Sequence, residues 1–558
     1  MTCWGRANRL ARSSAAGKLR LFALALALGA GLLSPGHVRA ETGQWSQPVR
    51  ITGELPAGWF PDVAADDLGN VHVVWNSTLP GRSDPVLSPA WGRQDGEAQA
   101  RGDVSSALFY TRRDAEGWTK PNDVGLAWRG VALRSSIAVG DQGRLHLIRL
   151  GLGKLEPESL GQEDLWYSSA DGSRAESVAS WRQPRRVTRA TQGYYSDIAV
   201  DSRGVIHAIW TESSRGTWGL YYSQSTDGGA TWSDRVALEG DEFVHWYRAQ
   251  LKVDARDRLH VVWELVDVRY DGDALVPSPQ TKAAAYAQSK DGGLTWSKTR
   301  FPPDCLPPYF FCGVPGPGPQ QPAVGVDGRG QVLLVFRETD GNGISYHLSA
   351  DGARWSPPLP LPGVRAGVNR PFDVYDMVTD SAGHVHLAAV GYADGSEAMS
   401  LLHVEWDGEG WRQPVVIAES PPYPEYPRLA VSRGNRLHAV WFGGDRPSVD
   451  RSPVGIWYST TQTAAPSPAT RLGVVPAASR DPTTAESTSR SAVLSPTPVP
   501  VSALGEASAQ DLRATALPRQ PEASPEWLSG VREHPAYPLL VAVAPVLALL
   551  ATALLVRS

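Results

Sequence analysis

The stretch IAVDSRGVIHAIW, residues 198–210, decides the fold because the chain repeats it. It consists of an apolar segment, a tight Asp/Gly turn and a second apolar segment, which is the pattern of a β-hairpin. Copies of this phrase begin at residues 63, 137, 251, 324, 377 and 429. Seven copies along the chain predict a repeat architecture.

A second phrase follows each hairpin. LYYSQSTDGGATWS (220–233) and AYAQSKDGGLTWS (285–297) both contain the pattern S-x-D-x-G-x-T-W, and four looser versions occur elsewhere. In this pattern the Asp accepts hydrogen bonds from turn amides, the glycines supply positive φ, and the Trp packs between sheets. The residues given these structural roles are Ser225, Asp227, Gly229, Trp232, Ser289, Asp291, Gly293 and Trp296.

Each repeat therefore predicts four antiparallel strands, which is the composition of a β-propeller blade. A Trp follows the last turn in six repeats, whereas the seventh repeat ends before its own Trp. The segment GQWSQPVRI (43–51) copies the missing strand. The predicted fold class is all-β, a seven-bladed propeller of four-stranded antiparallel blades whose N-terminal strand closes the last blade.

The Asp boxes at 225–232 and 289–296 resemble those of the sialidase superfamily of BNR/Asp-box propellers, over residues 44–460. The resemblance implies that the boxes are structural turns on the face opposite a ligand site. For a sialidase it also implies an arginine triad, a Tyr nucleophile activated by Glu, and an Asp acid/base. The comparable start, VRITGELPAGWFPDV, lacks the R-I-P or R-L-P phrase of sialidases, which usually have six blades. No catalytic residue is therefore carried over by motif.

The starts of the innermost strands are more polar than packing requires. Aligning the seven hairpins on Asp201 gives two columns of side chains, four and six positions upstream, around one axis. Arginines suit a carboxylate, aspartates suit hydroxyls and aromatic rings suit sugar faces, so these columns predict an anionic, hydroxyl-rich ligand. A water-filled channel mouth is the alternative. The residues predicted to bind ligand are Arg134, Arg248, Arg428, Asp62, Asp197, Asp376, Tyr195 and Tyr426.

Hydrolysis would need further groups on the same face. The candidates for catalysis are Tyr426, Glu338 and Asp62. Tyr426 follows Glu425 directly, so the two side chains diverge along a strand, and a Tyr–Glu pair would recruit its carboxylate elsewhere, for instance from Glu338. Residues near the ends of second strands are expected on this side as well; they are Arg149, Glu212, Glu264 and Glu338.

Six histidines form a column six residues after the hairpin Asp, one in each of six repeats. Around a ring they lie too far apart to share an ion, so they are interpreted as hydrogen-bonding groups inside the blades. No metal or cofactor is predicted. The Trp residues three positions further on are interpreted as packing between blades; they are Trp75, Trp210, Trp263 and Trp441.

The two ends of the chain predict export and anchoring. Residues 1–40 combine a basic start, an apolar run and a small-residue end, which are the features of a signal peptide. The propeller is assigned to 41–460, and 461–537 is rich in Pro, Ser, Thr and Ala, as in a disordered stalk. Residues 538–556 are apolar enough for a transmembrane helix before a cytoplasmic stub at 557–558. The predicted location is the cell surface.

Charge and cysteines narrow the partners and the compartment. The net charge is −5 and the propeller segment contains no basic block, so nucleic-acid binding has no electrostatic support. Cys305 and Cys312 share a Pro/Gly-rich loop and are predicted to form a disulfide in an oxidising compartment.

The leading hypothesis is a surface-anchored, sialidase-like propeller that binds extracellular glycans or glycoproteins. Two alternatives stay open: an exo-glycosidase of the sialidase type, and a non-enzymatic scaffold for protein partners. The sequence does not decide whether the protein is an enzyme; an enzyme of this kind would be a glycoside hydrolase.

Overall fold

The computed structural model describes residues 43–467 apart from 56–57, 79–105, 125–134, 153–162, 189–191, 215–216, 242–243, 272–273, 302–319, 339–342, 368–374 and 446–452. The predictions made for the signal peptide, the transmembrane helix, the disulfide and Arg134 lie outside these residues, as does most of the predicted stalk. No helix in the described part is long and apolar enough to cross a membrane.

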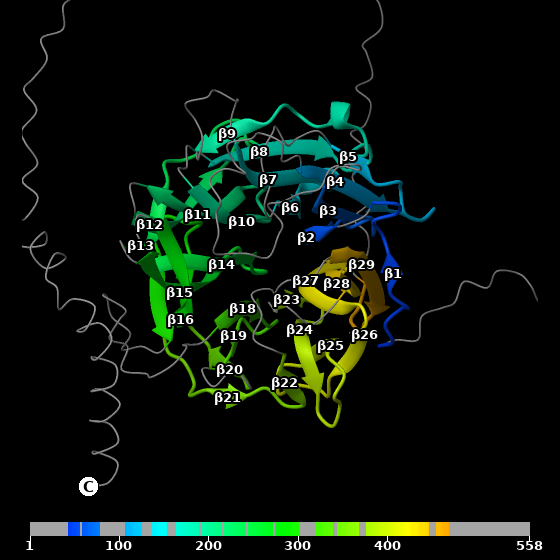
Figure 1. The fold of residues 1–558 in the computed structure, drawn as a ribbon, viewed down its shortest axis with the longest axis vertical. Coiled ribbons are helices and arrows are strands. Elements are labelled where there is room, and N and C mark those ends of the chain that lie inside the picture. Colours follow the sequence, from blue (N-terminus) through cyan, green and yellow to red (C-terminus); the bar gives the residue numbers. More distant parts are fainter. Residues whose placement is uncertain are drawn as a thin grey trace, which may run out of the picture. The chain divides into compact units, whose positions relative to one another are not determined.

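The described residues form seven antiparallel sheets that follow one another around a ring, as the sequence predicts (Figure 1). Six sheets have four strands, and the sixth blade has an additional strand, β22 (Val364–Ala366), paired with β24. In each blade the first strand lies nearest the axis and contacts the first strands of its neighbours. All-β architecture and blade number are therefore confirmed.

The strands of the first four blades are as follows. Blade one contains β2 (Trp59–Ala65), β3 (Val71–Thr78), β4 (Ser106–Arg113) and β5 (Asn122–Asp123). Blade two contains β6 (Ser136–Val139), β7 (Arg144–Leu152), β8 (Glu163–Asp171) and β9 (Arg185–Thr188). Blade three contains β10 (Gln192–Val200), β11 (Ile206–Ser214), β12 (Thr217–Ser225) and β13 (Val236–Asp241). Blade four contains β14 (Val244–Val253), β15 (Leu259–Asp271), β16 (Ala274–Ser289) and β17 (Ser297–Phe301).

The last three blades complete the ring. Blade five contains β18 (Gln320–Val326), β19 (Val332–Arg337), β20 (Ile344–Ser349) and β21 (Leu359–Pro360). Blade six contains β23 (Asp376–Thr379), β24 (Val385–Ala393), β25 (Ser400–Trp406) and β26 (Val415–Glu419). Blade seven contains β27 (Tyr423–Ser432), β28 (Arg436–Gly444), β29 (Pro453–Gln462) and, from the N-terminal end, β1 (Val49–Arg50).

The N-terminal segment closes the last blade, as predicted. Val49 pairs with Tyr458 and Arg50 with Trp457, so β1 forms the outer edge of blade seven. Ahead of β1, the backbone amide of Ser46 donates to the carbonyl of Thr460 at 2.8 Å. Trp45 packs edge-on against His403 of blade six at 5.4 Å between ring centroids. Trp45 therefore occupies the place that the seventh repeat leaves empty.

The Asp-box turns have the predicted local geometry. Asp227 Oδ1 accepts hydrogen bonds from the backbone amides of Ala230 and Thr231, both at 2.9 Å, and Asp227 Oδ2 accepts one from the Thr231 hydroxyl at 2.6 Å. Gly229 has φ +85°, and a Cβ there would meet the Tyr167 ring of the preceding blade at 1.9 Å. Only glycine satisfies both conditions.

Aromatic residues join each blade to the preceding one. Six Trp residues after the outer turns pack edge-on against a Tyr of the preceding blade, with centroids 4.8–6.0 Å apart. The pairs are Trp118–Tyr458, Trp181–Tyr110, Trp232–Tyr167, Trp296–Tyr222, Trp355–Tyr286 and Trp411–Tyr346. This edge-to-face geometry is favourable for aromatic rings and adds to burial.

The histidine column is structural. In five blades the His Nδ1 lies 2.7–2.9 Å from a Tyr hydroxyl of the same blade. In blade six His386 Nδ1 lies 2.9 Å from His403 Nε2. Several of these Tyr hydroxyls reach the next blade; that of Tyr222 donates to the carbonyl of Gly292 at 3.2 Å. The column therefore connects each hairpin to the sheet beside it.

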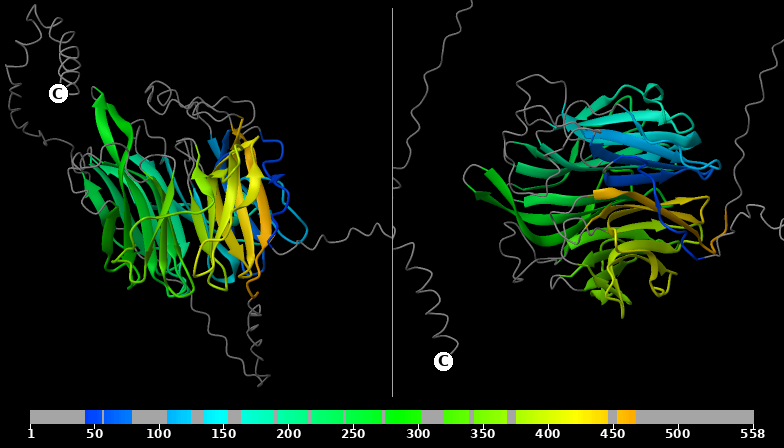
Figure 2. Two further views of the ribbon diagram at one scale, coloured as in Figure 1. Left: turned by 90° about the horizontal axis from the view of Figure 1, so that it is seen from below. Right: turned by 45° about the vertical axis from the view of Figure 1, so that its right-hand side comes forward.

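The ring has two distinct ends. We call the end with the hairpin turns and Asp-box turns the turn face, and the opposite end, where the innermost strands begin, the polar face. The chain leaves the propeller beside the turn face, because the Thr463 hydroxyl donates to Asp380 Oδ2 at 3.1 Å. The second and third strands of blade four form a long hairpin, β15–β16, which extends beyond the other blades (Figure 2).

Candidate functional site

The innermost strands bulge as they enter the ring from the polar face. The pairing register shifts in β2 between Trp59 and Asp62, in β18 between Gln320 and Ala323, and in β27 between Glu425 and Arg428. At the same point of each bulge the backbone is left-handed, with φ +48° at Phe60, +57° at Gln321 and +52° at Tyr426. Bulges of this kind redirect side chains next to binding sites.

Aromatic rings meet at this end of the axis. Phe60 of blade one and Tyr426 of blade seven pack edge-on, with centroids 5.3 Å apart. Phe60 is buried and Tyr426 is half-buried. The Arg428 guanidinium lies 6.0 Å from the centre of the Tyr426 ring. Tyr195 is buried in blade three, where its backbone amide donates to the Thr211 hydroxyl at 3.0 Å.

Two positions further along the strands, three aspartates bridge neighbouring blades. Asp62, Asp197 and Asp376 each accept a backbone amide from the innermost strand of the next blade, at 2.8–2.9 Å. The amides belong to Ile137, Leu251 and Leu429. The Ser136 hydroxyl lies between Asp62 and Asp197, 2.7 and 2.8 Å from a carboxylate oxygen of each. The aspartates therefore satisfy inner-strand amides that have no neighbouring strand.

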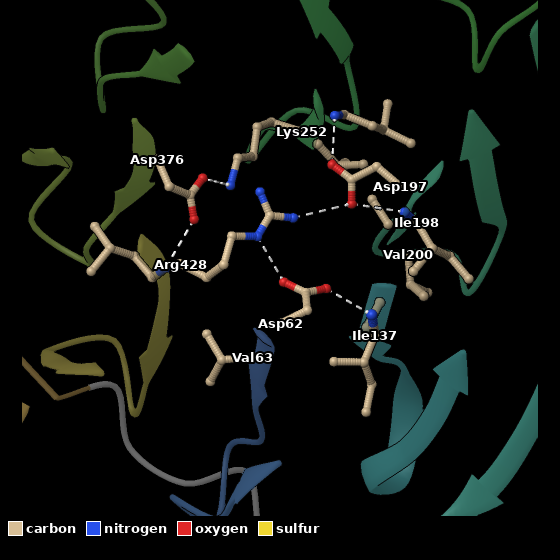
Figure 3. A pocket seen from close by; sticks show the side chains of 14 residues that line it. Asp62, Val63, Ile137, Asp197, Ile198, Val200, Lys252, Asp376 and Arg428 are labelled. Atoms are coloured by element: carbon tan, nitrogen blue, oxygen red, sulfur yellow. Dashed lines mark hydrogen bonds and ion pairs between the residues drawn. The ribbon is translucent and has the colours of Figure 1, made fainter. Parts of the chain in front are cut away.

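Two cations neutralise these carboxylates. Arg428 Nε donates to Asp62 at 2.9 Å, and Arg428 Nη2 lies 3.6 Å from Asp197 (Figure 3). Lys252 Nζ donates to Asp376 at 2.6 Å. Figure 3 shows the Arg428 guanidinium at the centre, between the three carboxylates. We call Asp62, Asp197, Asp376, Arg428, Lys252 and Ser136 the axial network.

Burial and charge oppose each other in this network. Burial raises the pKa of Asp197 above its ordinary value, although Arg428 acts in the other direction. Burial also acts to raise the pKa of Asp376, but the charges of Lys252 and Arg428 outweigh it and the pKa is lowered. Burial acts to lower the pKa of Arg428, and the three aspartates more than compensate, so its pKa is raised. Arg428 is therefore permanently charged and held by carboxylates.

A cavity of about 240 Å³ adjoins the axial network. Its lining extends from Asp62 and Arg428 along the innermost strands to Val200 and Val253, which precede the hairpin turns. The cavity therefore occupies the part of the channel between the network and the turn face. No group of three His, Cys, Asp or Glu side chains suited to a metal ion occurs among the residues that the structure describes.

The structure brings together only some of the predicted ligand-binding residues. Asp62, Asp197, Asp376 and Arg428 meet in the axial network, and Tyr426 lies above it towards the polar face. Arg248 lies in β14, whose side chain at this position is outside the described part. The assignment of all these residues to ligand binding stays a prediction.

The carboxylates of the second strands are engaged within the protein. Glu338 accepts a hydrogen bond from the Ser345 hydroxyl of its own blade. Glu212 accepts one from the Trp210 indole at 2.8 Å and pairs with Arg235, while Glu264 accepts the amide of Gln321. Glu338 is in blade five and Tyr426 in blade seven, so the structure does not bring this candidate pair together.

Sequence reasoning missed Lys252. It stands two residues before the hairpin Asp of its repeat, where the other blades have Ala64, Ala138, Ala199, Gly325, Val378 and Ala430. The alignment does show one long cationic side chain at a position where the other blades have small residues, and this exception could have identified Lys252. Ser136 and Gln250 stand in the aspartate column itself, and Gln250 donates to the carbonyl of Tyr375 at 2.7 Å.

Seven four-stranded blades, Asp-box turns on one face and a charged axis define an Asp-box β-propeller. The chain belongs to the family of BNR repeat-like domains, whose family model matches residues 161–439. No curated protein sequence matches it.

Several solved structures are similar in fold. A protein of unknown function from Dyadobacter fermentans is 13% identical with a TM-score of 0.41, covering 75% of this chain and 99% of its own. A mutant of the NanB sialidase from Streptococcus pneumoniae is 13% identical with a TM-score of 0.40, covering 74% and 70%. A polysaccharide lyase described as an ulvan lyase is 12% identical with a TM-score of 0.41, covering 74% and 93%.

Proposed function

We propose that this propeller binds a glycan on its polar face, around the axis. The observation that supports this most directly is the left-handed backbone at Phe60, Gln321 and Tyr426, at equivalent bulges of three blades. A bulky residue in this conformation costs about 1–3 kcal/mol and persists where the surroundings impose it, most often at ligand sites. Of the aromatic pair at these bulges, Phe60 is buried and Tyr426 is half-buried, so the Tyr426 ring is the one that can contact a sugar.

Binding is better supported than hydrolysis. A nucleophilic Tyr needs an adjacent base, and the charged group placed over the Tyr426 ring is the Arg428 guanidinium, 6.0 Å from the ring centre. Arg428 itself is bound to Asp62, which leaves it poorly suited to hold a substrate carboxylate. The axial network therefore has the properties of a rigid floor beneath a binding surface.

Display at a cell surface is part of the proposal. Its support is the sequence of the two ends, together with the exit of the chain beside Asp380 and Asn435 on the turn face. A stalk that starts there would be attached at the end of the ring opposite the polar face.

A glycan array probed with the purified full-length protein tests the proposal. We expect binding to a subset of glycans; no signal on any neutral or anionic glycan would contradict it. A fluorogenic sialoside incubated with the same protein at pH 4–8 tests the hydrolytic alternative. Turnover that disappears in Tyr426→Phe would replace binding by hydrolysis as the function.

A further inference from the structure

The seam between blades one and two has an arginine where four other seams have a tryptophan. Trp75, Trp210, Trp263 and Trp441 are each at most 1% exposed and each belongs to a core cluster that includes the preceding blade. These residues stand nine positions after the aligned hairpin position. In blade two this position is Arg149, in the middle of β7.

The residue opposite Arg149 is polar as well. Trp210 packs with Leu150 of the preceding blade in one cluster, and the equivalent of Leu150 in blade one is Asn76. Side chains alternate along β3 and β7, whose pairing with β4 and β8 is uninterrupted. Asn76 and Arg149 therefore share the faces of Val74 and Leu147, which meet in one core cluster.

Ser135 borders the same seam from the innermost strand. It stands two residues before Ile137, which belongs to the cluster of Val74 and Leu147. Ser135 is 4% exposed, Arg149 2% and Asn76 1%. Three polar side chains thus replace an apolar contact at the polar-face end of one seam.

Within the part of the chain that the structure describes, four polar atoms of these side chains have no hydrogen-bond partner. Arg149 Nη1, both amide atoms of Asn76 and the Ser135 hydroxyl are buried without a hydrogen bond. Burial lowers the pKa of Arg149 to about 10, and no described carboxylate compensates for it. A buried, unpaired charge is strongly unfavourable, so its retention calls for a group that neutralises it.

We propose that Arg149, Asn76 and Ser135 form a binding site for one monovalent oxyanion, a carboxylate or a sulfate ester. A guanidinium donates two parallel N–H bonds to the two oxygens of such a group. The Asn76 amide and the Ser135 hydroxyl donate to the remaining lone pairs. A dianionic phosphate would leave one negative charge uncompensated inside the seam, so a single negative charge fits best.

The site lies where a ligand of the polar face can reach it. β3 and β7 run from the turn face towards the polar face, and Asn76 and Arg149 lie in their second halves. Because the three side chains are nearly inaccessible, the oxyanion enters end-on between the blades. The molecule to which it is attached, its carrier, stays outside. The inference rests on the proposed function only for that carrier, which would be an acidic or sulfated glycan.

Thermal unfolding of the full-length protein tests the site without any glycan. At constant ionic strength, acetate and methyl sulfate should raise the melting temperature of the wild type by a few degrees over chloride, because they bind the folded state only. Arg149→Met should lose this response and be at least as stable as the wild type in chloride, because it removes an unpaired buried charge. The double variant Arg149→Trp with Asn76→Leu introduces the pair found in the seam between blades two and three, Trp210 with Leu150, and should also be stable and unresponsive.

Arg354→Met is the matched control, since Arg354 is 92% exposed on a turn and should retain the anion response. D-glucuronate, glucose 6-sulfate and glucose then identify the carrier: one of the first two should bind about tenfold or more tighter than glucose, and only when Arg149 is present. An equal anion response in Arg149→Met would overturn the proposal, and so would a wild-type melting temperature in chloride or in phosphate equal to that in acetate and methyl sulfate. Glycan binding that depends on Tyr426 while this response is absent would refute the oxyanion site alone.

Discussion

Arg428 shows how a residue that looks like a ligand clamp can be a structural centre. It stands in the sequence column predicted to hold an anion, yet its guanidinium contacts Asp62 and Asp197. Each of these aspartates also accepts an inner-strand amide of the next blade. Removing the guanidinium would leave buried carboxylates facing one another.

We therefore expect Arg428→Met to lower the free energy of unfolding by about 3–5 kcal/mol, because removing one partner of a buried ion pair leaves the other charges uncompensated inside the protein. Chemical denaturation of the full-length protein measures this. Arg354→Met, on an exposed turn, should change it by no more than about 0.5 kcal/mol. Equal stability of both variants and the wild type would show that Arg428 does not support the ring.

At the residue scale the sequence predicts which residues stand at equivalent positions of the blades better than it predicts which side chains contact one another. Asp62, Asp197 and Asp376 were found from the hairpin alignment, because one residue in each repeat occupies each place around the axis. The alignment does not show that Arg428 of blade seven contacts carboxylates of blades one and three. Lys252 escapes notice, and Arg149 is predicted only to lie on the polar side, because each matters as an exception to its column.

The individual blade is held by hydrogen bonds between its turn and its core. In blade three Asp201 Oδ2 lies 3.4 Å from His207 Nε2, and His207 Nδ1 lies 2.7 Å from the Tyr222 hydroxyl. Burial lowers the pKa of His146 to about 4 and those of His403 and His438 to about 3. These histidines are neutral inside the blades and protonate only when the protein unfolds.

The free energy of unfolding should consequently fall as the pH drops below about 6.5, the pKa of an unfolded His. The folded pKa values lie lower, so the unfolded state binds more protons, and the stability present above pH 6.5 is lost down to about pH 4 and below. Each such His contributes up to about 1.4 kcal/mol per pH unit. Denaturation midpoints between pH 7 and 4.5 measure the slope.

His146→Gln should make that slope shallower, because it removes a group that binds its proton in the unfolded state. A stability that is flat from pH 7 to 4.5 in the wild type would refute the neutral-histidine interpretation.

Closure by the N-terminal segment is also a property of one element. Deleting residues 41–52 removes β1, leaves the edge of β29 unpaired and empties the place of Trp45 beside His403. We expect a loss of about 3–5 kcal/mol, because the deletion removes the half-buried Trp45 together with the buried Ile51 and Thr52. Melting of the truncated chain within a degree or two of the intact one would show that the ring does not need this strand.

Elements were predictable because their signals are local and repeated. A hairpin turn and an Asp box each place their Asp, Gly and Trp within a few residues, so one copy explains all seven. The bulges at Phe60, Gln321 and Tyr426 leave no comparable mark, since three different residue types adopt the same left-handed backbone. Their conformation is imposed by the surrounding ring.

At the scale of the whole molecule the two faces of the ring differ in the features that they contain. The turn face contains the Asp-box turns, the hairpin turns and the exit of the chain, and its polar groups are bonded to one another. The polar face contains the bulges, the aromatic pair and the unpartnered seam of Arg149. This asymmetry supports placing ligand recognition on the polar face.

The most direct test of this account is the affinity of the full-length protein for its best array glycan, measured by calorimetry for one variant on each face. Tyr426→Gly removes the ring and keeps the left-handed backbone, so it should fold normally and bind about tenfold or more weakly. Leu294→Ala, at a residue 74% exposed on an Asp-box turn, should bind as the wild type does. Undiminished affinity in Tyr426→Gly, or a loss confined to Leu294→Ala, would contradict recognition by the polar face.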